Sequence, residues 1–349
     1  MKKALALTCA MTMAASLFLT GCGGNSYSFT SSTDSNSDSN SGGSNGSGKR
    51  VVNVCSWGEY IDEDLIYKFE DETGIKVNYQ TAESNEALYS LLKTGAGDYD
   101  VIVPSDYMIA RLIDEGMLAE LNYDNIPNYE KIGEQYKSLS FDPENKYTVP
   151  YTWGTLGIIY NSTMVDGDID SWDAMFDEKY AGNVLMIRNS RDALAAALLD
   201  LGYDINTTDE SQIREAYELL ADAKSKGVYQ SFVMDEVFGK MEGSNWLVDA
   251  MCVLKTAQHK EEAEAWINFI ASTESNLANM DYIGYASPNL EALEGYPAYY
   301  EETYGEPLDE ERYEIMAAPD DVLARCELYT NLPADTLTLY NDLWTELGI

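Results

Sequence analysis

The chain has 349 residues, of which 45% are hydrophobic, so it is long and apolar enough for a globular body with a substantial core. Its 60 acidic and 22 basic residues give a formal net charge of -38. This negative field repels phosphate backbones and excludes nucleic acid as a partner. An acidic surface alone reflects solubility as readily as an affinity for cations.

The N-terminus predicts export. Lys2 and Lys3 precede an apolar run from Ala4 to Leu19, which is too short to span a bilayer permanently and is typical of a signal peptide. The tetrapeptide LTGC, ending at Cys22, resembles the lipobox of bacterial lipoproteins. We therefore expect residues 1–22 to form a lipoprotein signal peptide with the lipid on Cys22. An ordinary secretory signal with an incidental cysteine is the alternative.

Residues 23–49 are almost wholly Gly, Ser, Asn, Thr and Asp. This composition cannot bury enough apolar surface to offset the entropy of ordering, so we predict a flexible tether. A lipid on Cys22 would then hold the globular body at the outer face of the cell membrane or in the periplasm.

The body opens with alternating strand and helix patterns. A helix with Leu65 and Phe69 on one face is expected to end before Gly74, and Ser84 is expected to cap the next helix. The strands expected around them are 51–55, 76–79 and 99–103. This alternation is typical of a mostly parallel sheet flanked by helices.

A second α/β unit follows. We expect strands at 156–160 and 184–187, a short helix capped by Ser171, and a helix at 193–201. After Trp246 an apolar run to Leu254 and a helix carrying Ala263 to Ile270 return the chain to the first unit.

Aromatic and acidic side chains follow two of the predicted strands. Trp57, Glu59 and Tyr60 come after the first strand, and Ser105 and Tyr107 after the third. Ligands of open α/β sheets bind at the carboxyl ends of strands. A carboxylate pairs with an ammonium, while ring faces attract the charge and cover the methylenes. The alternative is that the rings pack in the core and Glu59 is solvated.

Seven ordered blocks carry a family resemblance. They are 57–60, 72–77, 99–107, 149–155, 190–192, 248–251 and 283–289. Together they resemble the spermidine/putrescine-binding proteins of ABC importers, over nearly all of the body after the tether. The resemblance implies a two-lobed, type II periplasmic-binding-protein fold, with residues 50–152 plus 248–305 in lobe 1 and 153–247 plus 306–349 in lobe 2.

The resemblance also implies a ligand site. Trp57, Tyr60, Tyr107 and Tyr285 would supply aromatic walls, Ser105 would line the cleft, and Glu59, Asp192 and Asp249 would hold ammonium groups. The family has a second acidic residue where this chain has Asn189. Trp246 lies one place from a family aromatic, so both lining the site and lying outside it remain open.

The largest departure from the family lies at the junction of Gly243 and Ser244. Relatives carry a strand, a helix and a further strand there, which belong to the second lobe. We therefore expect a shortened second lobe with an exposed apolar edge. Either the remaining elements close up, or the chain is a degenerate binder or a sensor.

Other motifs are weaker. Asp166, Asp168, Asp170 and Asp177 are spaced as in a calcium loop, but Ser171 stands where the turn needs glycine, so an acidic loop is favoured. A carboxylate hydrolase using Glu59 and Asp106 is a rival function. No motif for a metal or cofactor is evident. Cys55, Cys252 and Cys326 allow one disulfide or three free thiols. His259 is expected to be exposed, and the tyrosine-rich tract 296–304 is interpreted as a connecting loop.

Together with these patterns, the resemblance implies a monomeric, non-enzymatic polyamine binder that closes on its ligand and presents the closed form to the permease subunits of an ABC importer.

Overall fold

The computed structural model describes residues 50–233 and 244–349. The predicted signal peptide with Cys22 and the tether to residue 49 therefore lie outside the described residues, as does the Gly243 side of the junction. Within the described ranges no helix is both long and apolar enough to cross a membrane.

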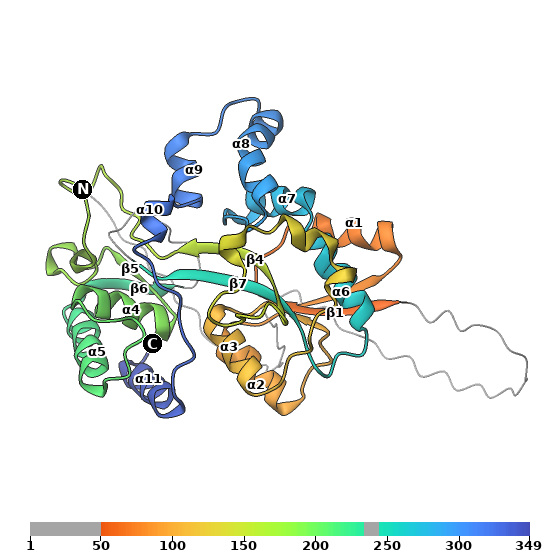
Figure 1. Cartoon of the computed structure of the whole chain (residues 1–349). Coiled ribbons are helices and arrows are strands. Elements are labelled where there is room, and N and C mark those ends of the chain that lie inside the picture. Colours follow the sequence, from red (N-terminus) through yellow and green to blue (C-terminus); the bar gives the residue numbers. More distant parts are fainter. Residues whose placement is uncertain (1–49, 234–243) are drawn as a thin grey trace, which may run out of the picture. The chain divides into compact units, whose positions relative to one another are not determined.

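Five strands form the larger sheet, in the order β2-β1-β3-β7-β4, and Figure 1 shows β7 and β4 running side by side. The strands are β1 Val51–Ser56, β2 Lys76–Thr81, β3 Val101–Ile102, β4 Thr148–Thr155 and β7 Trp246–Val253. β1 is parallel to β2 and β3, whereas β7 is antiparallel to β3 and β4. All strands but β7 thus run in one direction, so the predicted mostly parallel sheet is confirmed for this lobe.

Local signals set the first helices. They are α1 Asp64–Thr73, α2 Asn85–Thr94 and α3 Asp106–Asp114. Gly74 ends α1 with φ +68°, a left-handed conformation that lacks a steric cost only in glycine. The Ser84 side chain accepts a hydrogen bond from the Ala87 amide and so caps α2. Both predicted helix boundaries are confirmed.

Side chains of the larger sheet alternate between two hydrophobic clusters, as the pleat of a strand requires. Val54 faces the cluster that contains Phe69 of α1 and Trp266 of α6 (Lys260–Ile270). Cys55 faces the opposite cluster, with Leu112 of α3. Helices therefore cover both faces of the sheet, which is a doubly wound arrangement.

The smaller sheet has two parallel strands, β5 Val184–Ile187 and β6 Tyr229–Val233. Helices α4 Ser190–Asp200, α5 Glu210–Ser225 and α11 Ala334–Leu347 share one hydrophobic cluster with it, and Figure 1 shows them gathered around β5 and β6. In the described part of this lobe the sheet is thus small, in agreement with the predicted shortening. Leu185 of β5 is 43% exposed on the face of this sheet opposite Val184 and Met186.

The remaining elements complete the chain. The helices are α7 Thr273–Ile283, α8 Leu290–Tyr304, α9 Glu310–Met316 and α10 Asp320–Leu323. Short 3-10 helices occupy Tyr123–Asn125, Pro127–Lys131, Glu134–Tyr136, Trp172–Met175 and Glu178–Tyr180. Ser171 caps the fourth of these by accepting from the Asp173 amide, as predicted.

Two sequence predictions were wrong. Residues 156–160 are not a strand, because β4 ends at Thr155, where its pairing with Trp246 of β7 stops. The tract 296–304 is not a loop but the second half of α8, which tolerates Pro297 and buries Tyr296 at 2% exposure.

The residues that follow the junction at Ser244 pair with a segment that is distant in the sequence. Asn245 forms a parallel bridge with Glu327, and the Trp246 amide donates to the Glu327 carbonyl at 2.8 Å. The lobe boundaries predicted at 152/153 and 247/248 fall within β4 and β7, where Trp153 lies opposite Val248.

The three cysteines of the described body are free thiols. Cys55 pairs with Ile102, and Ile102 pairs with Cys252, so two strand spacings of about 4.8 Å each separate the cysteines. This exceeds the Cα separation that a disulfide can bridge.

Candidate functional site

The first part of the site lies where β1 ends. Trp57 and Tyr60 follow this strand directly, and Asp249 lies within β7 with 5% exposure. The Tyr60 hydroxyl donates to Oδ2 of Asp249 at 2.8 Å, and Trp57 Nε1 donates to the same oxygen at 3.3 Å. Two segments that are 189 residues apart thus meet at one buried carboxylate.

Thr152 of β4 extends this arrangement. It lies opposite Asp249 in the sheet, and its Oγ1 is 2.8 Å from the Tyr60 hydroxyl. Burial raises the pKa of Tyr60 well above its usual range, and the Asp249 carboxylate raises it further. Tyr60 therefore keeps its proton and remains a donor to Asp249.

Tyrosine rings surround Tyr60. Its centroid lies 5.5 Å from that of Tyr285 with an interplanar angle of 79°, and 5.5 Å from that of Tyr151 with an angle of 60°. The Tyr151 hydroxyl also donates to the Tyr60 backbone carbonyl. These edge-on contacts fix the ring positions and form an aromatic wall next to Asp249.

The second part of the site lies where β3 passes into α3. The Tyr107 hydroxyl donates to Oε1 of Glu86 at 3.0 Å. The Ser105 backbone amide donates to Asn85 Oδ1 at 3.1 Å, and the Asn85 amide nitrogen donates to Ser105 Oγ at 3.0 Å. The first turn of α2 thus supplies partners for both predicted residues.

Asp192 comes from the first turn of α4. Its Oδ1 accepts a hydrogen bond from the Tyr329 hydroxyl at 2.9 Å, and the Tyr329 ring packs edge-on to Tyr107 at 6.2 Å. The pKa of Asp192 is raised to about 6: burial is the main cause and Glu86 and Asp249 contribute, while the Tyr329 hydrogen bond and the Arg191 charge oppose the rise. Asp192 and Asp249 therefore lie within electrostatic range of one another.

Asp106 joins the two parts. It is fully buried, and its carboxylate accepts from the Tyr107 amide at 2.7 Å and the Tyr329 amide at 3.2 Å. Burial raises the pKa of Asp106 well above its usual range, and Asp249 adds to the rise. Because Asp106 is the first residue of α3, its bond to the Tyr329 amide links this helix to the segment after α10.

We refer to the residues assembled in this way as the tyrosine–carboxylate cluster. It comprises Trp57, Tyr60, Glu86, Tyr107, Asp192, Asp249, Tyr285 and Tyr329.

Four predicted residues lie outside this cluster. Ser105 adjoins it through its two hydrogen bonds with Asn85. Glu59 is exposed, has φ +52°, and accepts a hydrogen bond from the Tyr282 hydroxyl at 3.0 Å. Asn189 caps α4 by accepting from the Arg191 and Asp192 amides. The Trp246 ring packs 6.0 Å from Tyr136.

Sequence reasoning missed Thr152, Glu86 and Tyr329. Thr152 lies in the block 149–155, which carries the family resemblance, and Glu86 lies in the first turn of the helix that Ser84 caps. Their polar side chains could therefore have been recognised as candidates from the sequence. Tyr329 follows no predicted strand, and only the folded chain brings it to Asp192.

The carboxylate pair of the rival hydrolase is not arranged for catalysis. Glu59 is exposed and bound to Tyr282, whereas Asp106 is fully buried and held by two backbone amides. A glycosidase needs both carboxyl groups to face one accessible bond.

The acidic loop does not gather its carboxylates. Asp177 accepts from the Lys179 amide at 2.8 Å and caps a 3-10 helix, while Asp168 accepts from Tyr160 at 3.4 Å. No group of three or more potential metal-ligating side chains occurs in residues 50–233 and 244–349. His259 is only half-exposed, because its Nδ1 lies 3.0 Å from the buried Asp100 carboxylate.

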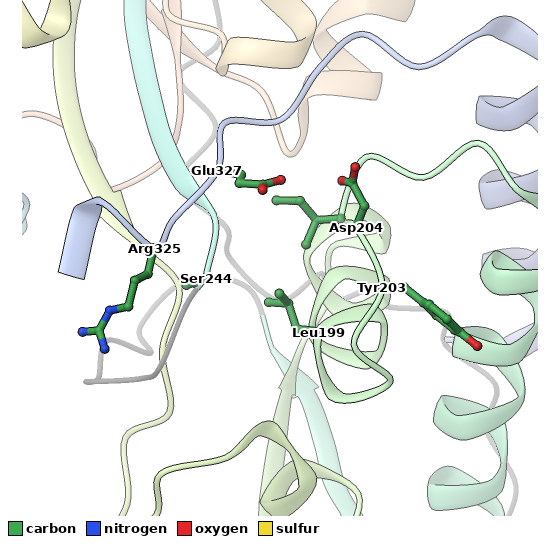
Figure 2. A pocket seen from close by; sticks show the side chains of 7 residues that line it. Leu199, Tyr203, Asp204, Ser244, Arg325 and Glu327 are labelled. Atoms are coloured by element: carbon green, nitrogen blue, oxygen red, sulfur yellow. The ribbon is translucent and has the colours of Figure 1, made fainter. Parts of the chain in front are cut away.

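A separate pocket lies beside α4. It is lined by Leu199, Tyr203, Asp204, Ile205, Ser244, Arg325 and Glu327, none of which belongs to the tyrosine–carboxylate cluster. In Figure 2 the guanidinium of Arg325 extends away from the carboxylate of Glu327. The pocket is therefore not part of the tyrosine–carboxylate cluster.

Comparison with known proteins fits this architecture. The family described as bacterial extracellular solute-binding protein matches residues 64–236. The spermidine/putrescine-binding periplasmic protein of Salmonella typhimurium is 33% identical over 268 residues, which cover 68% of this chain and 77% of the relative.

Two solved structures agree with the fold. A Listeria monocytogenes structure, provisionally named as a spermidine/putrescine ABC transporter, has a TM-score of 0.78 and 34% identity, covering 86% of this chain and 99% of that one. The substrate-binding protein PotD of Streptococcus pneumoniae, solved with calcium and HEPES, has a TM-score of 0.69 and 31% identity, covering 85% and 98%.

The fold is therefore the two-lobed α/β fold of extracytoplasmic solute-binding proteins. Within this class, the chain belongs to the bacterial extracellular solute-binding family, in the branch whose members are PotD-like.

Proposed function

We propose that this protein captures polyamines, with putrescine or spermidine as the ligand, for an ABC importer. The observation that carries the proposal is the buried Asp249 carboxylate, which is held by Tyr60 at 2.8 Å and Trp57 at 3.3 Å beside the Tyr285 ring. A carboxylate within an aromatic wall suits an alkyl ammonium, because charge pairing and cation–π attraction act on the same group.

Asp192 receives a second ammonium in this proposal, since its carboxylate lies within electrostatic range of Asp249. Tyr107 and Tyr285 cover the methylenes between the two charges. Ser105 lines the path between them. Glu59, Asn189 and Trp246 would contribute only if ligand binding rearranged their present contacts, and no bond of the ligand is made or broken.

The names of the relatives support the ligand class. The Salmonella typhimurium relative is named for spermidine and putrescine, and the Streptococcus pneumoniae PotD structure for a spermidine/putrescine ABC transporter. The proposal extends to a monomer that is tethered by the lipid on Cys22 and recognised by permease subunits when closed.

Titration calorimetry tests the ligand class. Putrescine, spermidine and spermine are titrated into the purified protein, with glycine betaine and maltose as controls. Saturable heat with a polyamine, and none with betaine or maltose, is the expected result. Binding confined to betaine or sugar would reassign the ligand, and a folded protein that binds none of the five would indicate a degenerate or sensor role.

Fractionation tests the anchor. The native chain is expected in the membrane fraction and the Cys22→Ser variant in the soluble exported fraction. Equal distribution of the two would contradict lipidation at Cys22.

A further inference from the structure

Arg191 is a buried cation beside the candidate site. It is the second residue of α4 and only 3% exposed. Its Nη1 and Nη2 reach the Thr330 carbonyl and Asn206 Oδ1, each at 3.4 Å, which is the long end of hydrogen bonding. Its Nε has no hydrogen-bond partner within the described residues.

Three tyrosine rings surround this guanidinium. Its central carbon lies 4.6 Å from the Tyr329 centroid, 5.2 Å from that of Tyr107 and 5.7 Å from that of Tyr340. The rings come from the segment after α10, from α3 and from α11. Arg191 therefore contacts α3, the helix that follows the central strand β3 of the larger sheet, as well as elements packed on the smaller sheet.

A buried guanidinium without a bidentate carboxylate costs desolvation, and only part of this cost is offset by cation–π contacts. A buried cation that is paired so weakly adds little to stability, which points to another task for this side chain. The two nearest rings end in hydroxyls that donate to carboxylates: Tyr107 donates to Glu86, and Tyr329 donates to Asp192.

The charged and titratable groups that face Asp192 come from several elements. They are Arg191 on α4, Tyr329 after α10, Glu86 on α2, Tyr107 on α3 and Asp249 on β7. Arg191 is the cation among these groups, and it lowers the pKa values of Asp192, Tyr107, Tyr329 and Asp106 against the effect of burial.

We propose that Arg191 is a positioning residue for ligand capture: its guanidinium holds the Tyr107 and Tyr329 rings, and through their hydroxyls it sets Glu86 and Asp192 to receive an ammonium group. This inference rests on the proposed function for its ligand, but the geometry that it describes exists without ligand. Arg191 itself does not touch the ligand.

The test compares Arg191→Met and Arg191→Lys with native protein, and Arg214→Met serves as the matched control. Arg214 is exposed on α5 and bonds to Glu210. At pH 7 we expect Arg191→Met to bind putrescine or spermidine at least about tenfold more weakly, Arg191→Lys to fall between it and native protein, and Arg214→Met to bind as native protein does.

A second readout needs no ligand. Carboxyl carbon NMR of aspartate-labelled protein follows the Asp192 signal, which is assigned by its loss in Asp192→Asn. Removal of the Arg191 charge should move the Asp192 midpoint to a higher pH, and the lysine variant should restore most of the shift. A loss of stability alone would leave this midpoint unchanged in the folded protein.

Tyr329→Phe keeps the proposal testable if Arg191→Met does not fold. This variant retains the ring but loses the bond to Asp192, so its effect on affinity should not add to that of Arg191→Lys. An unchanged Asp192 midpoint in the Arg191 variants, or additive effects of the two substitutions, would overturn the proposal. Absence of polyamine binding by native protein would instead overturn the proposed function and leave the midpoint result intact.

Discussion

The hydroxyl of Tyr329 lies 2.9 Å from Oδ1 of Asp192, although 137 residues separate the two in the sequence. This bond joins the segment after α10 to the first turn of α4. Because burial raises the pKa of Asp192 to about 6, the protonation of this one carboxyl couples the stability of the folded protein to pH.

The first prediction concerns that coupling. The folded-state pKa of Asp192, about 6, exceeds the value of about 3.9 for an unfolded aspartate, so the folded chain holds more protons between these pH values. The contribution of Asp192 to the free energy of unfolding therefore falls as pH rises from about 4 to about 6. Asp192→Asn removes this dependence. As pH rises from about 4 to about 6, the free energy of unfolding of the variant should therefore rise by about 2 kcal/mol relative to that of native protein. Urea unfolding at pH 4.5 and pH 7 measures it, and a constant difference between the two proteins would refute the coupling.

The second prediction separates two carboxylates near the end of β1. Asp249→Asn should weaken polyamine binding about thirtyfold or more, because a buried charge that pairs with the ligand is lost. Glu59→Gln should leave the dissociation constant within about twofold, because Glu59 is exposed and engaged with Tyr282. Calorimetry on both variants shows which carboxylate binds the ligand. Equal losses of affinity would mean that Glu59 also binds it.

Much of the first lobe could be predicted from the sequence, because its signals are local. Gly74 marks the end of α1 through its positive φ, and Ser84 caps α2 through a bond within one turn. The end of β4 could not be predicted, because it is set by pairing with Trp246 of β7, which lies far away in the chain.

The site was predictable only in part. Trp57 and Tyr60 follow β1, so their position at its carboxyl end needed no tertiary information. Glu59 lies between them in the sequence, but its φ is positive and its side chain is at the surface. No rule of residue spacing predicts this exposure. The approach of Tyr329 to Asp192 depends on the packing of the C-terminal segment.

The third prediction concerns the core of the first lobe. Phe69 is fully buried, with Trp266 at 5.1 Å and Phe269 at 5.4 Å. Phe69→Ala should lower the free energy of unfolding by about 3–5 kcal/mol, through lost burial and the cavity left behind. Tyr67→Ala on the same helix is the control, since Tyr67 is 61% exposed and should change stability by less than about 1 kcal/mol. Comparable losses in both variants under urea unfolding would contradict this view of the core.

The last prediction addresses Asn189, at whose position the family resemblance implies a carboxylate. Asn189 caps α4 through its side-chain oxygen, which accepts from the Arg191 and Asp192 amides at 2.8 and 3.4 Å. Asn189→Asp keeps an oxygen in the same place, and aspartate is an equally good cap with a charge that favours a helix N-terminus. Stability should therefore change little.

The added charge lies three residues before Asp192, so it should strengthen polyamine binding about threefold to fivefold, the gain expected of a partly exposed ion pair. Asn161→Asp is the matched control, because Asn161 also accepts from a nearby amide, that of Thr163, but in an exposed turn outside the tyrosine–carboxylate cluster. Calorimetry at low and high salt measures both variants. If Asn161→Asp strengthens binding as much as Asn189→Asp, the effect is the long-range field of the acidic protein, and position 189 has no local part in holding the ligand.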